Sequence, residues 1–179
     1  EGSAPVNFQG KYLEFNNVII HPKPIRQPPA IYISDAAAAV HPKVPERVAR
    51  FGTGLILHRA PDILSSIINT LDPLLETNGR ALSDIDLVWT GVASLARTHE
   101  EAVERYTKSR MEKYGRKEGL ENFVDNNFIG TPEELADVIY KLEKLGLSHC
   151  APNNFAANSY TEYLEQVQMM GEEIIPLFK

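Results

Sequence analysis

Hydrophobic residues gather in short runs that alternate with longer amphipathic segments along most of the chain. The runs predict buried strands at residues 30–33, 55–57, 85–93 and 147–151. Apolar residues at helical spacing follow each of them, so the pattern predicts four βα units. Short strands that are apolar on both faces are typical of a parallel sheet covered by helices, either doubly wound or part of a (β/α)8 barrel.

Capping residues mark the beginnings of three predicted helices. Thr98 and Thr131 are each followed three positions later by glutamate, which is the capping-box pattern. Ser159 begins the last helix, for which we expect Leu164, Val167, Met170 and Ile174 to point inward. The helix at residues 62–78 contains Pro73, which predicts a kink or a break.

The first 29 residues have a different pattern from the rest. Residues 6–20 are rich in β-formers and predict an extended hairpin. Residues 21–29 contain four prolines and predict an extended connector. We therefore interpret residues 1–179 as one domain, in which residues 1–29 lead into the four βα units of residues 30–179.

The composition argues against several classes of function but does not identify one. The net charge is -6 and there is no basic run, which argues against a nucleic-acid partner. No apolar stretch approaches membrane length, and the first residues lack a signal-peptide pattern. The single cysteine fits a reducing, cytoplasmic compartment. No phosphate-binding glycine loop, metal-ligand cluster or Ser-His-Asp pattern is visible.

Several motifs, in order, resemble the luciferase-like flavin monooxygenases, the family of bacterial luciferase. They are the hairpin Val6-Asn7-Phe8-Gln9-Gly10-Lys11-Tyr12, the Pro-rich lead into Ile31-Tyr32-Ile33, the turn Val48-Ala49-Arg50-Phe51-Gly52-Thr53-Gly54, the turn Asn78-Gly79-Arg80 and the late motif Gly130-Thr131-Pro132-Glu133-Glu134. The resemblance implies a (β/α)8 barrel, of which this chain would be the C-terminal half. It also implies that strands one to four, which carry most catalytic side chains in the family, are not in this sequence.

The best candidate site follows the first strand, because barrel active sites lie at the carboxyl ends of the strands. The resemblance implies that Ser34, Asp35, Ala36 and Ala37 help to hold a flavin phosphate there. Ala36 stands where relatives carry a hydroxyl, and Asp35 would repel phosphate unless it orients a donor. An ordinary strand-to-helix turn is the alternative. The catalytic residues are left unassigned, and no metal is expected.

Other candidates lie near the same edge or nearby in sequence. His41 and His58 could act as an acid or base, and His58-Arg59 could meet an anion, although solvated loop residues are the simpler reading. Cys150 lies beside His149 in a strand, so the two side chains should point to opposite faces, and a buried structural thiol is expected. Residues 115–127 are polar and predict a mobile loop, placed where the resemblance implies a lid.

The resemblance implies a flavin-dependent monooxygenase that uses reduced flavin and O2 to oxidise a small organic substrate such as an aldehyde. The cofactor would be FMN or another reduced flavin, with a deazaflavin as an alternative, and a flavin reductase could supply it. The alternative function is a non-catalytic, luciferase-like subunit that stabilises a partner. A half barrel has two open sheet edges, so we expect a homo- or hetero-oligomer or a piece of a longer protein.

Overall fold

The structure is a computed structural model that describes residues 4–23, 25, 28–35, 41–115 and 117–178. It divides into two compact units, Glu1–Ala30 and Ile31–Lys179.

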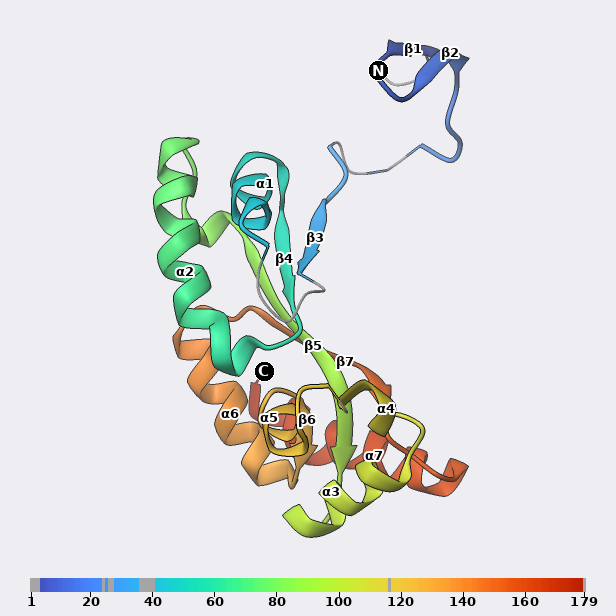
Figure 1. Cartoon of the computed structure of the whole chain (residues 1–179), viewed down its shortest axis with the longest axis vertical. Coiled ribbons are helices and arrows are strands. Elements are labelled where there is room, and N and C mark those ends of the chain that lie inside the picture. Colours follow the sequence, from blue (N-terminus) through green and yellow to red (C-terminus); the bar gives the residue numbers. More distant parts are fainter. Residues whose placement is uncertain (1–3, 24, 26–27, 36–40, 116, 179) are drawn as a thin grey trace. The chain divides into compact units, whose positions relative to one another are not determined.

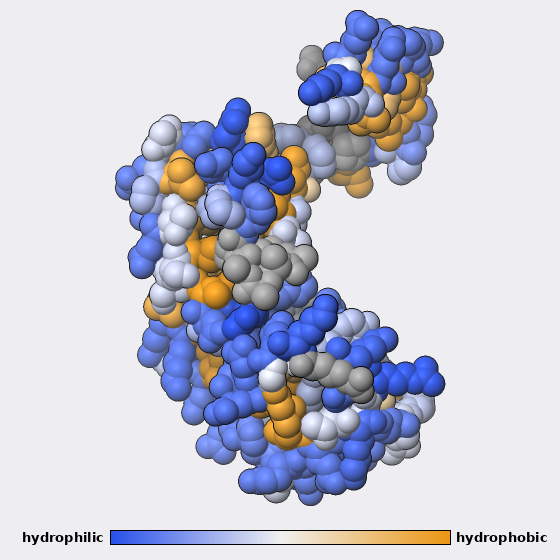
Figure 2. Space-filling view, viewed as in Figure 1, coloured by the Kyte–Doolittle hydropathy of each residue, from blue (hydrophilic) through white to orange (hydrophobic). Residues whose placement is uncertain are grey.

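The first unit is the hairpin predicted from its β-formers. Strands β1 (Val6–Gln9) and β2 (Glu14–Val18) pair antiparallel, with Phe8 opposite Phe15. Their rings are 6.0 Å apart and both remain exposed. Figure 2 shows hydrophobic residues at the surface of this unit. A lone two-stranded hairpin is marginal in water, so this apolar surface needs cover to be stable.

The second unit is built on the predicted parallel sheet. Strands β3 (Tyr32–Asp35), β4 (Gly54–Leu57) and β5 (Asp86–Leu95) are neighbours in that order, and β7 (His149–Phe155) pairs with β5. All of these pairings are parallel. Val88 pairs with residues of both β4 and β7, so these two strands lie on opposite edges of β5.

A fifth strand, β6 (Phe128–Gly130), was not predicted. It pairs with the last residues of β5, beyond the point where β4 ends, and shares the β4 edge. Between the two, Asn127 Oδ1 accepts a hydrogen bond of 2.8 Å from the backbone N–H of Val92. The side chain thereby replaces a strand where the ladder is interrupted.

Helices cover this sheet as the alternation predicted. Figure 1 shows α2 and α6 along one side of the sheet, with α3 and α7 near the carboxyl end of β5. None of the described helices is long and apolar enough to cross a membrane. The helices are α1 (Lys43–Phe51), α2 (Ala60–Thr77), η1 (Leu82–Asp84), α3 (His99–Lys108), α4 (Glu112–Gly115), α5 (Leu120–Asp125), α6 (Pro132–Lys144), α7 (Tyr160–Met169), η2 (Met170–Ile174) and η3 (Ile175–Phe178).

The core lies between the sheet and α1, α2 and α6. Trp89 is its largest fully buried side chain and stacks on Phe128 at 3.9 Å between ring centroids. A smaller cluster around Tyr106 and Phe123 packs at the carboxyl end of β5. The predicted caps at Thr98, Thr131 and Ser159 are confirmed, because each side chain accepts a hydrogen bond from the N–H three residues on.

Several elements differ from the prediction, including β7, which runs over His149–Phe155 rather than residues 147–151. The first strand begins at Tyr32 and includes Asp35, because its pairing with β4 runs to that residue. Helix α2 runs unbroken through Pro73, so the predicted break is wrong. Helix α3 ends at Lys108 rather than near residue 114, where Ser109 adopts an extended backbone.

The inward face predicted for the last helix is wrong in part. Leu164 and Val167 are 46% and 40% exposed, whereas Gln166 and Met169 are buried. The Gln166 side chain accepts from the N–H of Leu95 and donates to the carbonyl of Ala156. These hydrogen bonds turn a polar residue toward β5, and apolar periodicity alone could not show it. Met170 and Ile174 do pack inward, in or against the core.

Candidate functional site

Ser34 and Asp35, two of the predicted rim residues, are the last residues of β3. They pair with Ile56 and Leu57 at the end of β4, so both strands end at the same edge of the sheet. Parallel barrels and sheets bind ligands at this carboxyl edge. Ala36 and Ala37 lie outside the described residues, as does the side chain of Asp35.

The structure brings His58 to the same rim. Ser34 Oγ lies 3.4 Å from His58 Nε2, so the residue after β4 contacts the end of β3. His41 does not join them by any described contact, because its Nδ1 accepts from the backbone N–H of Lys43 at the start of α1. Of the two histidines considered from the sequence, His58 is therefore the one that the rim includes.

A cavity of about 360 Å³ opens beside His58. It lies where β4 has ended and β5 and β7 continue. Its lining consists of His58 and Arg59 after β4, Gly91 and Val92 of β5, Asn153 and Asn154 of β7, and Tyr114, Glu118, Phe123 and Asn127 from the segment between α3 and β6. A concave pocket with a few polar groups is the usual form of a small-molecule site.

Arg59 holds the segments around this cavity together. Its guanidinium is 2.6 Å from Asp62 in the first turn of α2 and donates to Asn122 Oδ1 in α5 at 3.2 Å. Asn126 donates to the same Asp62 carboxylate at 2.9 Å. The hydrogen bond from Arg59, with help from Asn126, holds the pKa of Asp62 below its usual value.

Residues 117–127 contribute to one wall of this cavity, and the prediction of a loop is wrong in part, because they are not all loop. They contain α5, and Phe123 and Asn127 are buried. Phe123 stacks on Tyr106 at 4.9 Å, and the Tyr106 hydroxyl donates to the carbonyl of Glu112. Burial raises the pKa of Tyr106 to about 12. The apolar positions in α5 were the available signal, but the charged residues around them obscured it.

An irregularity in β7 adds two residues that the sequence did not single out. Pro152 pairs with Gly91 and Asn154 pairs with Val92, so Asn153 is an extra residue in the ladder. Such bulges redirect side chains next to binding sites. Asn153 and Asn154 both line the cavity, although neighbours in a regular strand would point to opposite faces.

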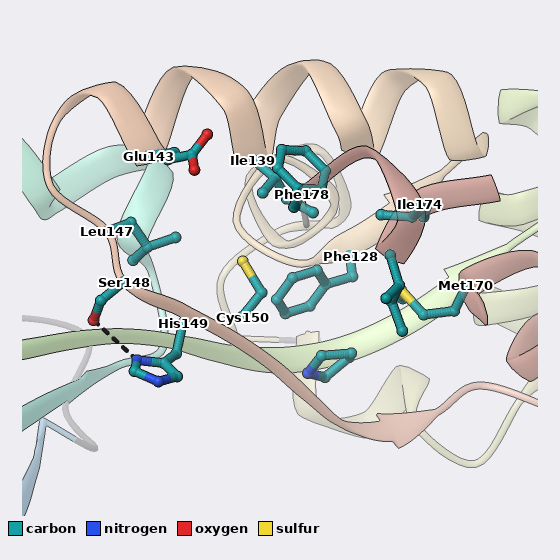
Figure 3. Close-up of a pocket in the computed structure, with 12 residues that line it drawn as sticks. Phe128, Ile139, Glu143, Leu147, Ser148, His149, Cys150, Met170, Ile174 and Phe178 are labelled. Atoms are coloured by element: carbon teal, nitrogen blue, oxygen red, sulfur yellow. Dashed lines mark hydrogen bonds between the residues drawn. The ribbon is translucent and has the colours of Figure 1, made fainter. Parts of the chain in front are cut away.

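A second cavity of about 350 Å³ lies between β7, α6 and the C-terminal turns, as Figure 3 shows. The Cys150 thiol points into it, and burial there raises the pKa of the thiol to about 12. The residue as a whole is nevertheless exposed, so the expectation of a buried cysteine is wrong in part: the thiol is shielded from solvent, but the residue is not in the core. His149 points away from the thiol and hydrogen-bonds to Ser148 at 3.0 Å, which confirms that the two residues form no dyad.

The side chains that line the two cavities limit the reactions and ligands that each cavity could support. A thiol with a raised pKa is a poor nucleophile near neutral pH. Among the residues that the structure describes, no three of His, Cys, Asp and Glu are grouped so that they could hold a metal ion. The cavity beside His58 instead offers hydroxyl, imidazole and amide groups, which suit hydrogen bonding to a polar ligand.

Solved structures with the same fold support a partial barrel. The chain superposes with a TM-score of 0.77 and 18% identity on an F420-dependent secondary alcohol dehydrogenase, covering 100% of this chain and 57% of that one. It superposes with a TM-score of 0.75 and 17% identity on the coenzyme F420 dependent tetrahydromethanopterin reductase from Methanopyrus kandleri, covering 99% of this chain and 59% of that one. For a long-chain alkane monooxygenase the TM-score is 0.62 and the identity 17%, covering 93% of this chain and 45% of that one. The chain thus spans little more than half the length of the first two, and its fold is part of a (β/α)8 barrel.

Sequence comparison gives the family directly. A comparison with curated protein sequences finds no match. The profile of the family described as luciferase-like monooxygenase matches residues 2–149, which is most of the chain. The chain therefore belongs to the luciferase-like monooxygenase family.

Proposed function

We propose that this chain supplies the C-terminal βα units of a luciferase-like oxidoreductase that binds a reduced flavin or a deazaflavin. The observation that carries the proposal is the contact between Ser34 and His58 at the ends of two adjacent parallel strands, beside a cavity of about 360 Å³. Neighbours in the fold include a dehydrogenase described as F420-dependent and an alkane monooxygenase.

The rim fits the phosphate end of such a cofactor. A serine hydroxyl and an imidazole can each donate a hydrogen bond to a phosphate oxygen, and protonated His58 would add a positive charge. Ser34 and Asp35, with Ala36 and Ala37 following, would provide this contact through the hydroxyl and backbone N–H groups. Arg59 supports the rim rather than the phosphate, because Asp62 already pairs with it.

The rest of the cavity would position and shield the reacting end. A bound reduced flavin supplies electrons for the reaction with O2, whereas a deazaflavin supplies hydride. Tyr114 of α4 and Phe123 of α5 line one side of the cavity and would limit the access of water there. A small organic substrate, such as an aldehyde, would be oxidised there in the monooxygenase version of the proposal.

The proposal includes a partner for the open sides of the sheet. Among the described strands, β3 pairs only with β4 and β7 pairs only with β5. Unpaired strand edges favour association. Leu164 and Val167 of α7 are also exposed apolar side chains. A further copy of this chain, another subunit or additional βα units would cover these surfaces. If the chain is instead a non-catalytic subunit, its role would be to stabilise its partner.

Cofactor binding tests the proposal without requiring turnover. Equilibrium dialysis of the purified chain against FMN and against riboflavin compares two ligands that differ only in the phosphate. We expect FMN to bind more tightly, and a Ser34→Ala variant to lose about tenfold of that preference, the value of one charge-assisted hydrogen bond. Dialysis against coenzyme F420 tests the deazaflavin version.

Ser65→Ala is the matched control, because Ser65 is exposed in α2 and belongs neither to the lining of the cavity nor to the contact between Ser34 and His58. It should leave the preference for FMN unchanged. Equal affinity for FMN and riboflavin would remove the phosphate assignment. Failure to bind FMN, riboflavin and F420 alike, by a chain that retains its cooperative unfolding, would contradict the proposed function of this chain.

A further inference from the structure

The bulge in β7 places two carboxamide side chains next to one another in the cavity. Asn154 Nδ2 donates to Asn153 Oδ1 at 2.9 Å, which fixes the relative orientation of the two amides. No other hydrogen bond to either side chain occurs among the described residues. Asn153 Nδ2 therefore has free donors, and Asn154 Oδ1 is a free acceptor.

The side-chain amide of Asn127, which also lines the cavity, is not available to bind a ligand. Asn127 Oδ1 accepts from the N–H of Val92, and its Nδ2 donates to the carbonyl of Phe123 at 2.8 Å. Both ends of that side chain are used within the fold. The cavity's free amide chemistry is thus concentrated on Asn153 and Asn154, where a donor and an acceptor lie side by side.

The shape of the cavity around this pair suits a flat ligand. Gly91 lies opposite the bulge and has no side chain to fill the space, while Tyr114 and Phe123 contribute aromatic surface. A ligand that satisfies the pair must present an acceptor next to a donor. A lactam or imide edge, –CO–NH–, has this arrangement within a planar ring.

We propose that Asn153 and Asn154 bind the lactam or imide edge of a flat cyclic ligand in this cavity. Two ligands could carry that chemistry, the pyrimidinedione edge of a flavin-type cofactor or a cyclic carboxamide substrate. The assignment uses the β7 bulge and does not depend on phosphate binding at Ser34. It goes beyond the proposed function by naming the residues that recognise a ring rather than a phosphate.

Glutarimide and N-methylglutarimide test the assignment, because the methyl group replaces the N–H donor of the imide and leaves both carbonyl acceptors in place. Titration of the ¹⁵N-labelled chain, followed through side-chain amide resonances, gives the affinity for each probe. We expect glutarimide to bind about tenfold more tightly, as one lost hydrogen bond with an unpaired acceptor predicts. Equal affinities, or shifts confined to resonances outside the cavity, would overturn the proposal.

Variants separate recognition from folding. Asn154→Leu should abolish the tenfold preference, because it removes the oxygen that accepts the imide N–H, and Asn153→Leu should weaken both probes alike, because both keep the carbonyl. Asn69→Leu, at an exposed position of α2, should leave both affinities unchanged. All four proteins should share one unfolding midpoint within a few degrees, because both cavity asparagines are exposed. Retention of the preference in Asn154→Leu, or unchanged affinities in Asn153→Leu, would also overturn the proposal.

Competition with FMN identifies the source of the edge. Displacement of glutarimide by FMN assigns the pair to the cofactor ring, and simultaneous binding assigns it to a substrate. If FMN does not bind at all, only the proposed function is contradicted. The difference in affinity between glutarimide and its N-methyl derivative still decides the role of Asn153 and Asn154.

Discussion

His99 Nδ1 lies 3.2 Å from Glu134 Oε2 and thereby joins the first turn of α3 to the first turn of α6. The same carboxylate oxygen accepts from the backbone N–H of Thr131 at 2.8 Å, within the α6 capping box. One side chain thus caps its own helix and contacts another. Burial of Glu134 raises its pKa, but the Thr131 N–H and His99 together lower it further than burial raises it.

Glu134→Ala should lower the free energy of unfolding at pH 7 by about 1 kcal/mol, the usual value of a helix cap, because the Thr131 N–H loses its acceptor. The ion pair adds little, because its two side chains are 45% and 49% exposed. Since the folded pKa of Glu134 lies below the reference value of 4.5, its contribution is present above that pH and is lost as pH falls through the folded pKa. Urea unfolding at pH 7 and below pH 4 measures the difference between wild type and variant, which should shrink in acid. The matched variant Glu133→Ala, at an exposed position of the same turn, should show a smaller effect at either pH.

Arg80→Ala should destabilise the sheet unit by about 2 kcal/mol, because three carbonyl groups lose a charged donor. The guanidinium donates to the carbonyls of Val48 and Ala49 at 3.1 Å and of Gly52 at 2.8 Å, where α1 ends. Thermal unfolding should show a lower midpoint than for Arg47→Ala, which removes an exposed arginine from the same helix. Equal midpoints would mean that water replaces the guanidinium without cost.

Gly91→Ala should cost about 1–3 kcal/mol through overpacking. A Cβ atom at Gly91 would lie 2.6 Å from Asn127 Oδ1, and that oxygen is held by the Val92 N–H. Gly171→Ala is the control, since a Cβ there meets nothing within 4 Å. Chemical unfolding compares the two variants. A neutral result at Gly91 would show that Asn127 can move and that the cavity wall is less rigid than its hydrogen bonds indicate.

Gln166→Leu should destabilise the chain by about 2–4 kcal/mol, because it leaves the Leu95 N–H and the Ala156 carbonyl buried without partners. Burial of the added apolar side chain does not offset two unsatisfied backbone groups. Gln168→Leu, two positions away and exposed, should change stability by less than about 0.5 kcal/mol. Similar unfolding curves for the two variants would contradict a structural role for the buried amide.

The sequence by itself determined the parallel βα scaffold and most helix starts. Strand hydrophobicity and capping chemistry are local, so the cap at Thr98, the capping box at Thr131 and the closing turns at Gly79 and Gly146 could be located without tertiary information. The family resemblance rested on the same local motifs in order, and the profile match over residues 2–149 confirms it.

Only the tertiary structure decided which side chains meet at the rim and in the cavity. Ser34 and His58 are 24 residues apart and come together because β3 and β4 pair in register. The bulge at Asn153 depends on how β7 pairs with β5, and the inward turn of Gln166 depends on the free N–H of Leu95. Hydrogen bonds between segments that are distant in sequence position polar residues of this kind. The hydrophobic pattern along the chain does not predict those partners.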